Sequence, residues 1–121
     1  MKTTIAIDNI IVPIETKEIT DCNILEVRAG TTGYRGGDSG HGGRTVVEFK
    51  DLASTDMRLS FQTQPLPDGS METISGQRVR ARNIECECIR LTFGGDAEMD
   101  TLIEALDFAA KTLRRMREKK D

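Results

Sequence analysis

Tryptophan is absent from this chain, and other aromatic residues are scarce: four phenylalanines and one tyrosine among 121 residues. A core built almost without aromatic rings is thin, and small domains with thin cores often gain stability by assembling into oligomers. The apolar fraction of 37% still allows a modest core, and the length suits one domain. We therefore expect a single domain over residues 1–121 that forms an oligomer.

Long apolar runs are also missing, and none approaches the roughly 20 residues of a membrane-spanning helix. Residues Met1–Val12 alternate in polarity and do not form the apolar core of a signal peptide, so we expect none. Three cysteines, Cys22, Cys86 and Cys88, form an odd set without a secretory signal. This pattern favours free thiols in a reducing cytosol.

Histidine occurs once, at His41, which leaves little material for metal binding or acid–base catalysis. Cys86 and Cys88 stand at CxC spacing, and Cys22 is distant in the sequence. Because the pair would point to the same face of one strand, we interpret these cysteines as packing residues. We expect no metal, no cofactor and no catalytic residues.

Charge is unevenly distributed along the chain, whose net charge is −3. Residues 111–121 carry a net charge of +4, which leaves −7 on the preceding 110 residues. A solvated helix end with cations that suit the helix dipole explains this pattern, and an anion-binding site explains it too.

Period-two alternation and β-branched residues predict an antiparallel sheet. Asn9 is expected to interrupt the first strand, and Pro13 suits a strand end or an edge. Residues 64–75 contain two prolines and Asp68-Gly69 and are expected to form a loop. The expected strands are Thr4–Ile14, Asn23–Ala29, Arg44–Lys50, Asp56–Thr63 and Asn83–Phe93.

From Asp96 onward, apolar residues recur at helical spacing, through Met99 and Leu102 to Leu113 and Met116. Asp96 is expected to cap this helix, and its apolar stripe is expected to lie on the sheet. The predicted fold class is α+β, an antiparallel sheet with a long C-terminal amphipathic helix packed on it.

The segment GDSG around Ser39 has the form of a protease nucleophile motif. Such a serine needs a histidine base and an oxyanion hole, and His41 is too close in sequence to reach Ser39 in the required geometry. A Walker A loop does not fit either, because an arginine replaces its lysine and a strand follows where a helix is needed. We conclude that Ser39 is not a nucleophile.

Seven of the fifteen residues Gly30–Arg44 are glycine, which makes the segment costly to order. A flexible linker would explain the glycines, but not the side chains interspersed among them. Glycines let backbone N–H groups converge on an anion. Tyr34 can stack on a base, Arg35 and Arg44 can bind phosphates, and Asp38 can accept ribose hydroxyls. We interpret the segment as a loop for a nucleotide-like ligand.

A second anion site is indicated by Arg58 on a strand and by Arg114 and Arg115 on the helix. In a symmetric oligomer each arginine is repeated around an axis, so a multiply charged, symmetric molecule would fit there.

The segments EVRAGTTGYRGGDSGHGGRT, STDMR and FGGDAEMDTLIEALDFAAKTL together resemble the first-described Thoeris anti-defence family of phages. The resemblance runs from about Asn23 to Leu113. It implies a cytoplasmic protein of the infected bacterium that binds and sequesters glycocyclic ADP-ribose signals without degrading them. It also implies a homo-oligomer (dimer or hexamer), binding of CBASS cyclic trinucleotides at a separate site, and no contact with DNA or membrane.

By this resemblance the signal pocket falls on residues 34–44, with Arg28 and Phe93 added, and the trinucleotide site falls on Arg58, Arg114 and Arg115. The expected signal-binding residues are Arg28, Tyr34, Arg35, Gly36, Gly37, Asp38, His41, Arg44 and Phe93. Two other functions stay open: a nucleotide-processing enzyme that uses Asp38 and His41, and an interaction module that docks a host protein through the C-terminal helix.

Overall fold

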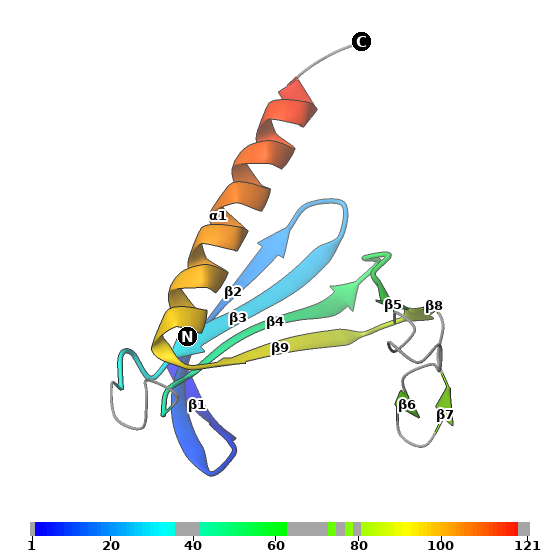
Figure 1. Cartoon of the computed structure of the whole chain (residues 1–121). Coiled ribbons are helices and arrows are strands. Elements are labelled where there is room, and N and C mark those ends of the chain that lie inside the picture. The colour runs from blue at the N-terminus through cyan, green and yellow to red at the C-terminus, as the bar shows by residue number, and fades with distance from the viewer. Residues whose placement is uncertain (1, 36–41, 63–72, 75–76, 79–80, 119–121) are drawn as a thin grey trace. The chain divides into compact units, whose positions relative to one another are not determined.

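The structure is a computed structural model that describes residues 2–35, 42–62, 73–74, 77–78 and 81–118 (Figure 1). The strands are β1 (Lys2–Ile7), β2 (Ile10–Thr20), β3 (Ile24–Thr31), β4 (Arg44–Ala53), β5 (Arg58–Gln62), β6 (Thr73–Ile74), β7 (Gln77–Arg78), β8 (Ala81–Glu85) and β9 (Cys88–Gly94), and the helix is α1 (Asp96–Glu118).

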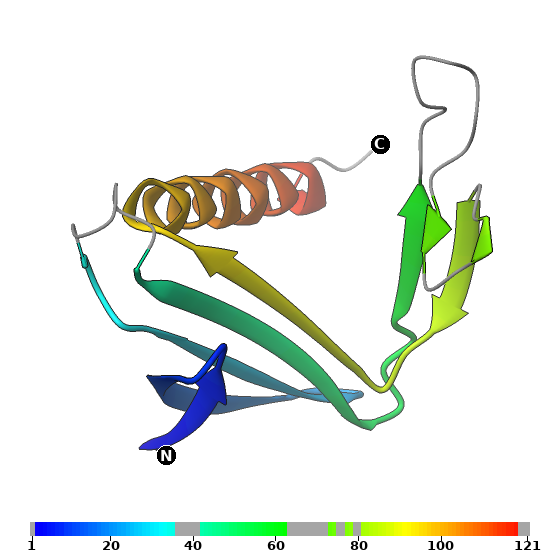
Figure 2. The ribbon, with the colours of Figure 1, turned by 60° about the horizontal axis from the view of Figure 1, so that its bottom comes forward.

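Five strands form one antiparallel sheet in the order β1-β2-β3-β4-β9. The helix α1 packs on one face of this sheet (Figure 2). The predicted α+β class, an antiparallel sheet with a long C-terminal helix on it, is therefore confirmed. Two smaller antiparallel pairs, β5-β8 and β6-β7, complete the strands. None of the helical residues described forms a stretch long and apolar enough to cross a membrane.

Contacts divide the chain into two compact units. The first, which we call the helix unit, comprises Met1–Lys17, Val27–Glu48 and Arg90–Asp121. The second, the strand unit, comprises Glu18–Glu26 and Phe49–Ile89. The expected single domain over residues 1–121 stays a prediction.

The first predicted strand is in fact a hairpin. Asp8 and Asn9 form its two-residue turn, with φ of 50° and 64°. Positive φ at both central positions is typical of a type I′ turn, which aspartate and asparagine tolerate better than most residues. Pro13 lies inside β2 opposite Thr4, and β2 has neighbours on both sides. The expectation that Pro13 lies at a strand end or a sheet edge was therefore wrong.

The last predicted strand is also divided, because β8 ends at Glu85 and β9 begins at Cys88. Cys86 and Cys88 thus do not share one strand, and Cys88 is exposed. The expectation that the pair shares one face of one strand was wrong, because the chain leaves one sheet and enters another between them, and the packing interpretation fails for the exposed Cys88. All three cysteines are thiols and not half of a disulfide, as expected.

The two faces of the sheet in the helix unit have different coverings. On the face toward α1, the Thr31 hydroxyl lies 2.8 Å from the Thr45 hydroxyl and donates to Met99 Sδ at 3.0 Å. Alternation along β4 places Val46 and Glu48 on the opposite face. There Val46 packs with Val12 and Ile14 of β2 in the fully buried core. We call these two surfaces the helix face and the hairpin face.

The helix starts at Asp96 as predicted, but Asp96 is not its cap. The first helical hydrogen bond runs from Met99 N–H to the carbonyl oxygen of Gly95, so Gly95, with φ of 122°, occupies the cap position. Only Met99 and Leu102 of the apolar stripe are buried, and Leu113 and Met116 are exposed. The sheet therefore covers the beginning of the stripe and not its full length, contrary to expectation.

Packing between two strands, and not ligand binding, accounts for the glycine at position 30. A Cβ at this position would overlap the carbonyl oxygen of Pro13 and would lie 2.9 Å from Ile14 Cδ1. Only a residue without a side chain lets β2 approach β3 this closely. Packing alone therefore requires at least one of the glycines in the Gly30–Arg44 segment.

We expect Gly30→Ala to lower the free energy of unfolding by about 2 kcal/mol or more, because the added methyl group must displace backbone. Urea denaturation measures this value. Gly42→Ala is the matched control, since its Cβ would meet Arg35 only at 3.5 Å or beyond. Equal stability of the two variants would contradict the packing argument.

Candidate ligand-binding site

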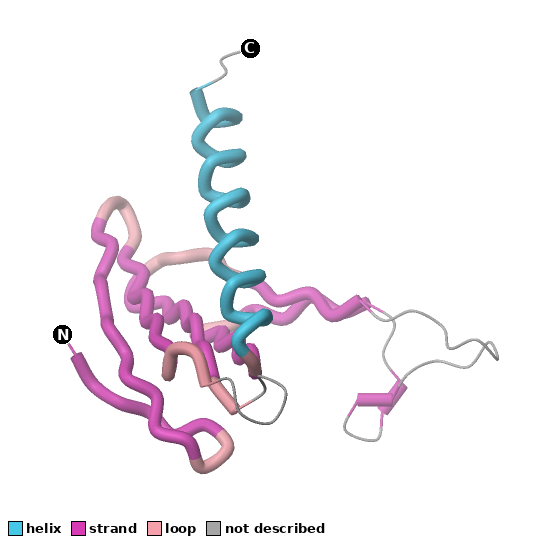
Figure 3. Tube along the Cα trace, turned by 60° about the vertical axis from the view of Figure 1, so that its left-hand side comes forward, coloured by secondary structure: helices cyan, strands magenta, loops and turns pink. Residues whose placement is uncertain are grey.

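The register of three strands brings both ends of the glycine-rich loop to the start of α1. Thr32 N–H donates to the Arg44 carbonyl at 3.0 Å, and Gly95 N–H donates to the Gly43 carbonyl at 3.0 Å. The loop therefore leaves β3 and enters β4 beside the turn between β9 and the helix. Figure 3 shows the described ends of this loop next to the base of α1.

Tyr34 and Arg35 fasten the first end of the loop to α1. The Tyr34 hydroxyl donates to Asp100 Oδ1 at 2.6 Å, and the Arg35 backbone N–H donates to Asp96 Oδ1 at 2.8 Å. The hydrogen bond to Asp100, then desolvation and the nearby carboxylate charges, raises the pKa of Tyr34 above its usual value. Tyr34 is 65% exposed while its hydroxyl is held, so the residue is accessible to a stacking partner.

Arg44 fastens the second end. Its Nε donates to Asp8 Oδ2 at 3.0 Å in the β1–β2 turn, and its Nη1 donates to the Gly43 carbonyl at 2.8 Å. Gly94 leaves the room for this guanidinium, because a Cβ there would stand 3.4 Å from Nη1. Arg44 is thus already held by a carboxylate, and an anion that binds it competes with Asp8.

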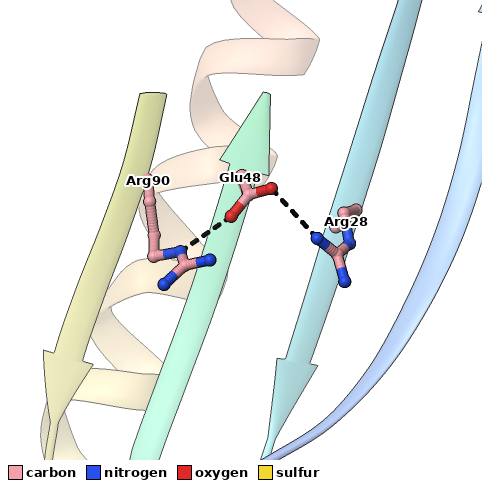
Figure 4. A network of polar contacts seen from close by, with 3 residues as sticks. All are labelled: Arg28, Glu48 and Arg90. Carbon is pink, nitrogen blue, oxygen red and sulfur yellow. Dashed lines mark hydrogen bonds and ion pairs between the residues drawn. The ribbon is translucent and has the colours of Figure 1, made fainter. Parts of the chain in front are cut away.

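A row of three charged side chains crosses the hairpin face, one from each of β3, β4 and β9 (Figure 4). Glu48 Oε1 accepts from Arg28 Nη1 at 3.3 Å, and Glu48 Oε2 accepts from Arg90 Nε at 2.7 Å. The Glu48 side chain is only 5% exposed, whereas Arg90 is 43% exposed. We call Arg28, Glu48 and Arg90 the arginine row.

Glu48 is ionised within this row. Burial by itself raises the pKa of a carboxyl group, but the hydrogen bond and charge of Arg90, followed by those of Arg28, outweigh it and lower the pKa of Glu48. The row therefore carries one negative and two positive charges. Each guanidinium has five N–H donors and uses only some of them on Glu48, so the row can also bind an anion at its exposed side.

The loop ends and the arginine row belong to the same unit, but they lie at different places on it. Arg44 and Glu48 are four residues apart on β4 and share the hairpin face, which separates them by about 13 Å. Phe93 is three residues from Arg90 on β9, so alternation places it on the helix face, away from Arg28. The predicted set of signal-binding residues is thus divided between the loop ends and both faces of the sheet.

Four of the predicted pocket residues, Gly36, Gly37, Asp38 and His41, lie outside the described residues, as does Ser39. For the second anion site, Arg58 belongs to the strand unit and Arg114 and Arg115 belong to the helix unit. Arg58 pairs with Asp56 through two N–H groups, each 3.1 Å from a carboxylate oxygen. Arg114 and Arg115 are exposed on α1.

Glu48 and Arg90 are polar residues of the site that the sequence analysis did not identify. The available signal is Glu48 itself, a single acid inside the apolar stretch Thr45–Phe49 of a predicted strand. A carboxylate buried in such a strand needs a cationic partner. The sequence does not say which arginine provides it, because that depends on the strand order.

The strand unit has a hollow of about 560 Å³ of a different character. Its lining includes the four acids Asp51, Asp56, Glu85 and Glu87. Negative charge of this density repels phosphates, so we do not place the ligand there. Over the residues with assigned positions, no group of three or more potential metal ligands comes together.

Comparisons with protein-family models, with curated proteins and with solved structures give no match to this chain. The family resemblance of the sequence motifs therefore stays a hypothesis, and the functional argument rests on the residues themselves.

We expect Glu48→Gln to destabilise the fold by about 1–3 kcal/mol at neutral pH, because it leaves two partly buried arginines without their carboxylate. The pKa of Glu48 is lower in the folded state than in the unfolded state. Glu48 therefore stabilises the fold fully at pH values above its unfolded-state pKa, and this contribution is lost as the pH falls through its folded-state pKa. The difference between wild type and variant should therefore shrink below about pH 4.5.

Urea denaturation at a series of pH values measures this difference. Asp56→Asn is the control, because the Asp56–Arg58 pair is exposed on both sides and should contribute less than about 1 kcal/mol. A difference between wild type and Glu48→Gln that does not change with pH would show that the charge of Glu48 is not what stabilises the row.

Proposed function

We propose that this protein binds and sequesters a cyclic nucleotide-like immune signal, with glycocyclic ADP-ribose as the first candidate, in a phage-infected cell. The observation that carries the proposal is the fixed geometry of the loop ends. An exposed tyrosine on one end is held by Asp100 of α1, and an arginine on the other end is held by Asp8 of the β1–β2 turn. A ring and a guanidinium in fixed positions lose little entropy when they bind a base and a phosphate.

The resemblance supports the same interpretation, because one of its motifs, EVRAGTTGYRGGDSGHGGRT, contains both loop ends. A sequestering protein needs affinity and no chemistry, so cations, a stacking ring and backbone donors are sufficient for it. The homo-oligomer that the resemblance implies, a dimer or a hexamer, and the separate site for cyclic trinucleotides belong to the same proposal.

The direct test mixes purified protein with glycocyclic ADP-ribose, removes the protein by filtration, and assays the filtrate for the signal. The retained protein is then heated and the released material is analysed by mass spectrometry. Signal that is missing from the filtrate and recovered intact supports sequestration. Signal converted to products supports the alternative of a nucleotide-processing enzyme. Signal left in the filtrate overturns the proposal for this ligand, and cyclic trinucleotides are then tested.

We expect Tyr34→Ala and Arg44→Ala each to weaken binding of the signal by about 10- to 100-fold, through loss of stacking and of a charge-assisted hydrogen bond. Ser39→Ala should change affinity little, because no nucleophile is required. Isothermal titration calorimetry measures all three. Loss of binding in Ser39→Ala alone would reverse this assignment.

Asp8→Asn separates the two roles of Arg44. If Arg44 binds the signal, removal of the competing carboxylate leaves its charge to the ligand, and affinity should rise or stay the same. If Arg44 only ties the loop to the β1–β2 turn, Asp8→Asn should weaken binding as Arg44→Ala does.

Arg58→Ala should weaken binding of cyclic trinucleotides and leave binding of glycocyclic ADP-ribose unchanged, because Arg58 belongs to a different unit from the loop ends. Parallel titrations with both ligands measure the two affinities. Equal loss for both ligands would argue against two separate sites.

A further inference from the structure

The arginine row carries hydrogen-bond donors that the fold does not use. Arg28 bonds Glu48 through Nη1 alone and Arg90 bonds it through Nε alone, and over the described residues neither guanidinium makes another hydrogen bond or ion pair. Each guanidinium has five N–H donors, so most of them remain available. An arginine that serves only to pair with a carboxylate commonly places two N–H groups on it, as Arg58 does with Asp56.

The sheet holds these donors in fixed positions. Arg28, Glu48 and Arg90 belong to β3, β4 and β9, which are adjacent strands. Neighbouring strands lie about 4.8 Å apart, so the backbones of the two arginines are separated by about 10 Å. From there the two guanidinium groups reach inward to different oxygens of one carboxylate, one group on either side of it (Figure 4). They therefore converge to within reach of one bridging anion.

Solvent reaches the two arginines but hardly reaches the carboxylate between them. The side chain of Arg28 is 24% exposed and that of Arg90 is 43% exposed, whereas that of Glu48 is 5% exposed. An anion from solution can therefore bind the outer N–H groups and leave the bonds to Glu48 intact. Thr92 is exposed two residues from Arg90 on β9, so alternation places its hydroxyl on the same face as a further donor.

The charge of the row determines which class of anion fits. Two guanidinium groups against the ionised Glu48 give the row a net charge of +1. A carboxylate carries one charge, and the repulsion of Glu48 offsets much of its attraction to the arginines. A phosphate group carries close to two charges at neutral pH and offers several oxygens, which the planar fork of arginine matches. The row therefore favours phosphate over carboxylate.

We infer that Arg28 and Arg90 together form a binding site for a phosphate group on the hairpin face, with Glu48 as the fixed carboxylate that holds both guanidinium groups in place. The site is separate from the loop ends, because Arg44 lies about 13 Å along β4 from the row. It requires no particular nucleotide, so its test uses a simple phosphate compound, and its outcome does not depend on whether the proposed function is correct.

An NMR titration of the full chain with inorganic pyrophosphate tests the site. The Nε–H signals of arginine side chains report on each guanidinium separately. We expect the signals of Arg28 and Arg90 to shift together and to saturate with one dissociation constant. Arg90→Gln should raise the dissociation constant measured at Arg28 by about tenfold or more, the loss typical of a charge-assisted hydrogen bond. Arg90→Lys keeps the charge with fewer donors and should lie between wild type and Arg90→Gln.

Arg58→Gln is the matched control, because it removes the same charge from an exposed arginine of the strand unit. It should bind pyrophosphate at the row as wild type does. Equal weakening in Arg58→Gln and Arg90→Gln would show only a general attraction between charges and overturns the inference. The amide spectrum of each variant verifies its fold, and Arg90→Lys serves for the comparison should Arg90→Gln not fold.

Two further outcomes decide the matter. No saturable shift at Arg28 and Arg90, or a shift confined to Arg44, overturns the inference, because the phosphate then binds elsewhere or not at all. A parallel titration with sodium acetate tests the preference for phosphate. Acetate should bind the row at least tenfold more weakly, and equal affinity for acetate and pyrophosphate overturns the assignment of a phosphate site.

Discussion

The register between β3, β4 and β9 is the constraint on which the helix unit depends. Thr32 pairs with Arg44, and Gly43 pairs with Gly95. The same register places Arg28, Glu48 and Arg90 in one row, so that one buried carboxylate ties three strands together. A shift of one residue on any of these strands would move its charged side chain to the helix face. It would also separate the loop ends from the base of α1, where Tyr34 and Arg35 are held.

The charges at the loop ends and in the arginine row follow one pattern. Two arginines of the predicted ligand-binding set are already paired with a carboxylate, Arg44 with Asp8 and Arg28 with Glu48. A fixed arginine costs less entropy to bind than a free one, but an anion must compete with the resident carboxylate. The balance differs between the two places. Asp8 is largely exposed and easily displaced, whereas Glu48 is buried and its loss would leave the row unsatisfied. Ligand exchange is therefore favoured at Arg44, and a structural role is favoured at Glu48.

Local patterns in the sequence predicted the elements that depend on local chemistry. The helix from Asp96 and the strands around β3 and β4 follow from periodicity, and the α+β class follows from them. The errors share a different cause. An interruption was expected at Asn9, but the chain reversal at Asp8-Asn9 was missed because neither residue is glycine. The break before Cys88 was missed because alternation continues through it. Glu48 and Arg90 are 42 residues apart, and only the strand order makes them neighbours. Gly30 appeared to belong to a ligand loop, since nothing in the sequence reveals that β2 passes over it.

The helix shows most clearly what a sequence pattern leaves undetermined. An apolar stripe on α1 indicates that another surface covers it, but it does not identify that surface. We assigned the whole stripe to the sheet, and the structure gives the sheet only its beginning, at Met99 and Leu102. A stripe with the helical period of 3.6 stays on one face of a straight helix, whereas a strict repeat of seven, as in this stripe, winds slowly around the helix. The role of the basic end of α1 is undetermined in the same way: Arg114 and Arg115 are exposed, and both a solvated helix end and an anion site are consistent with that position.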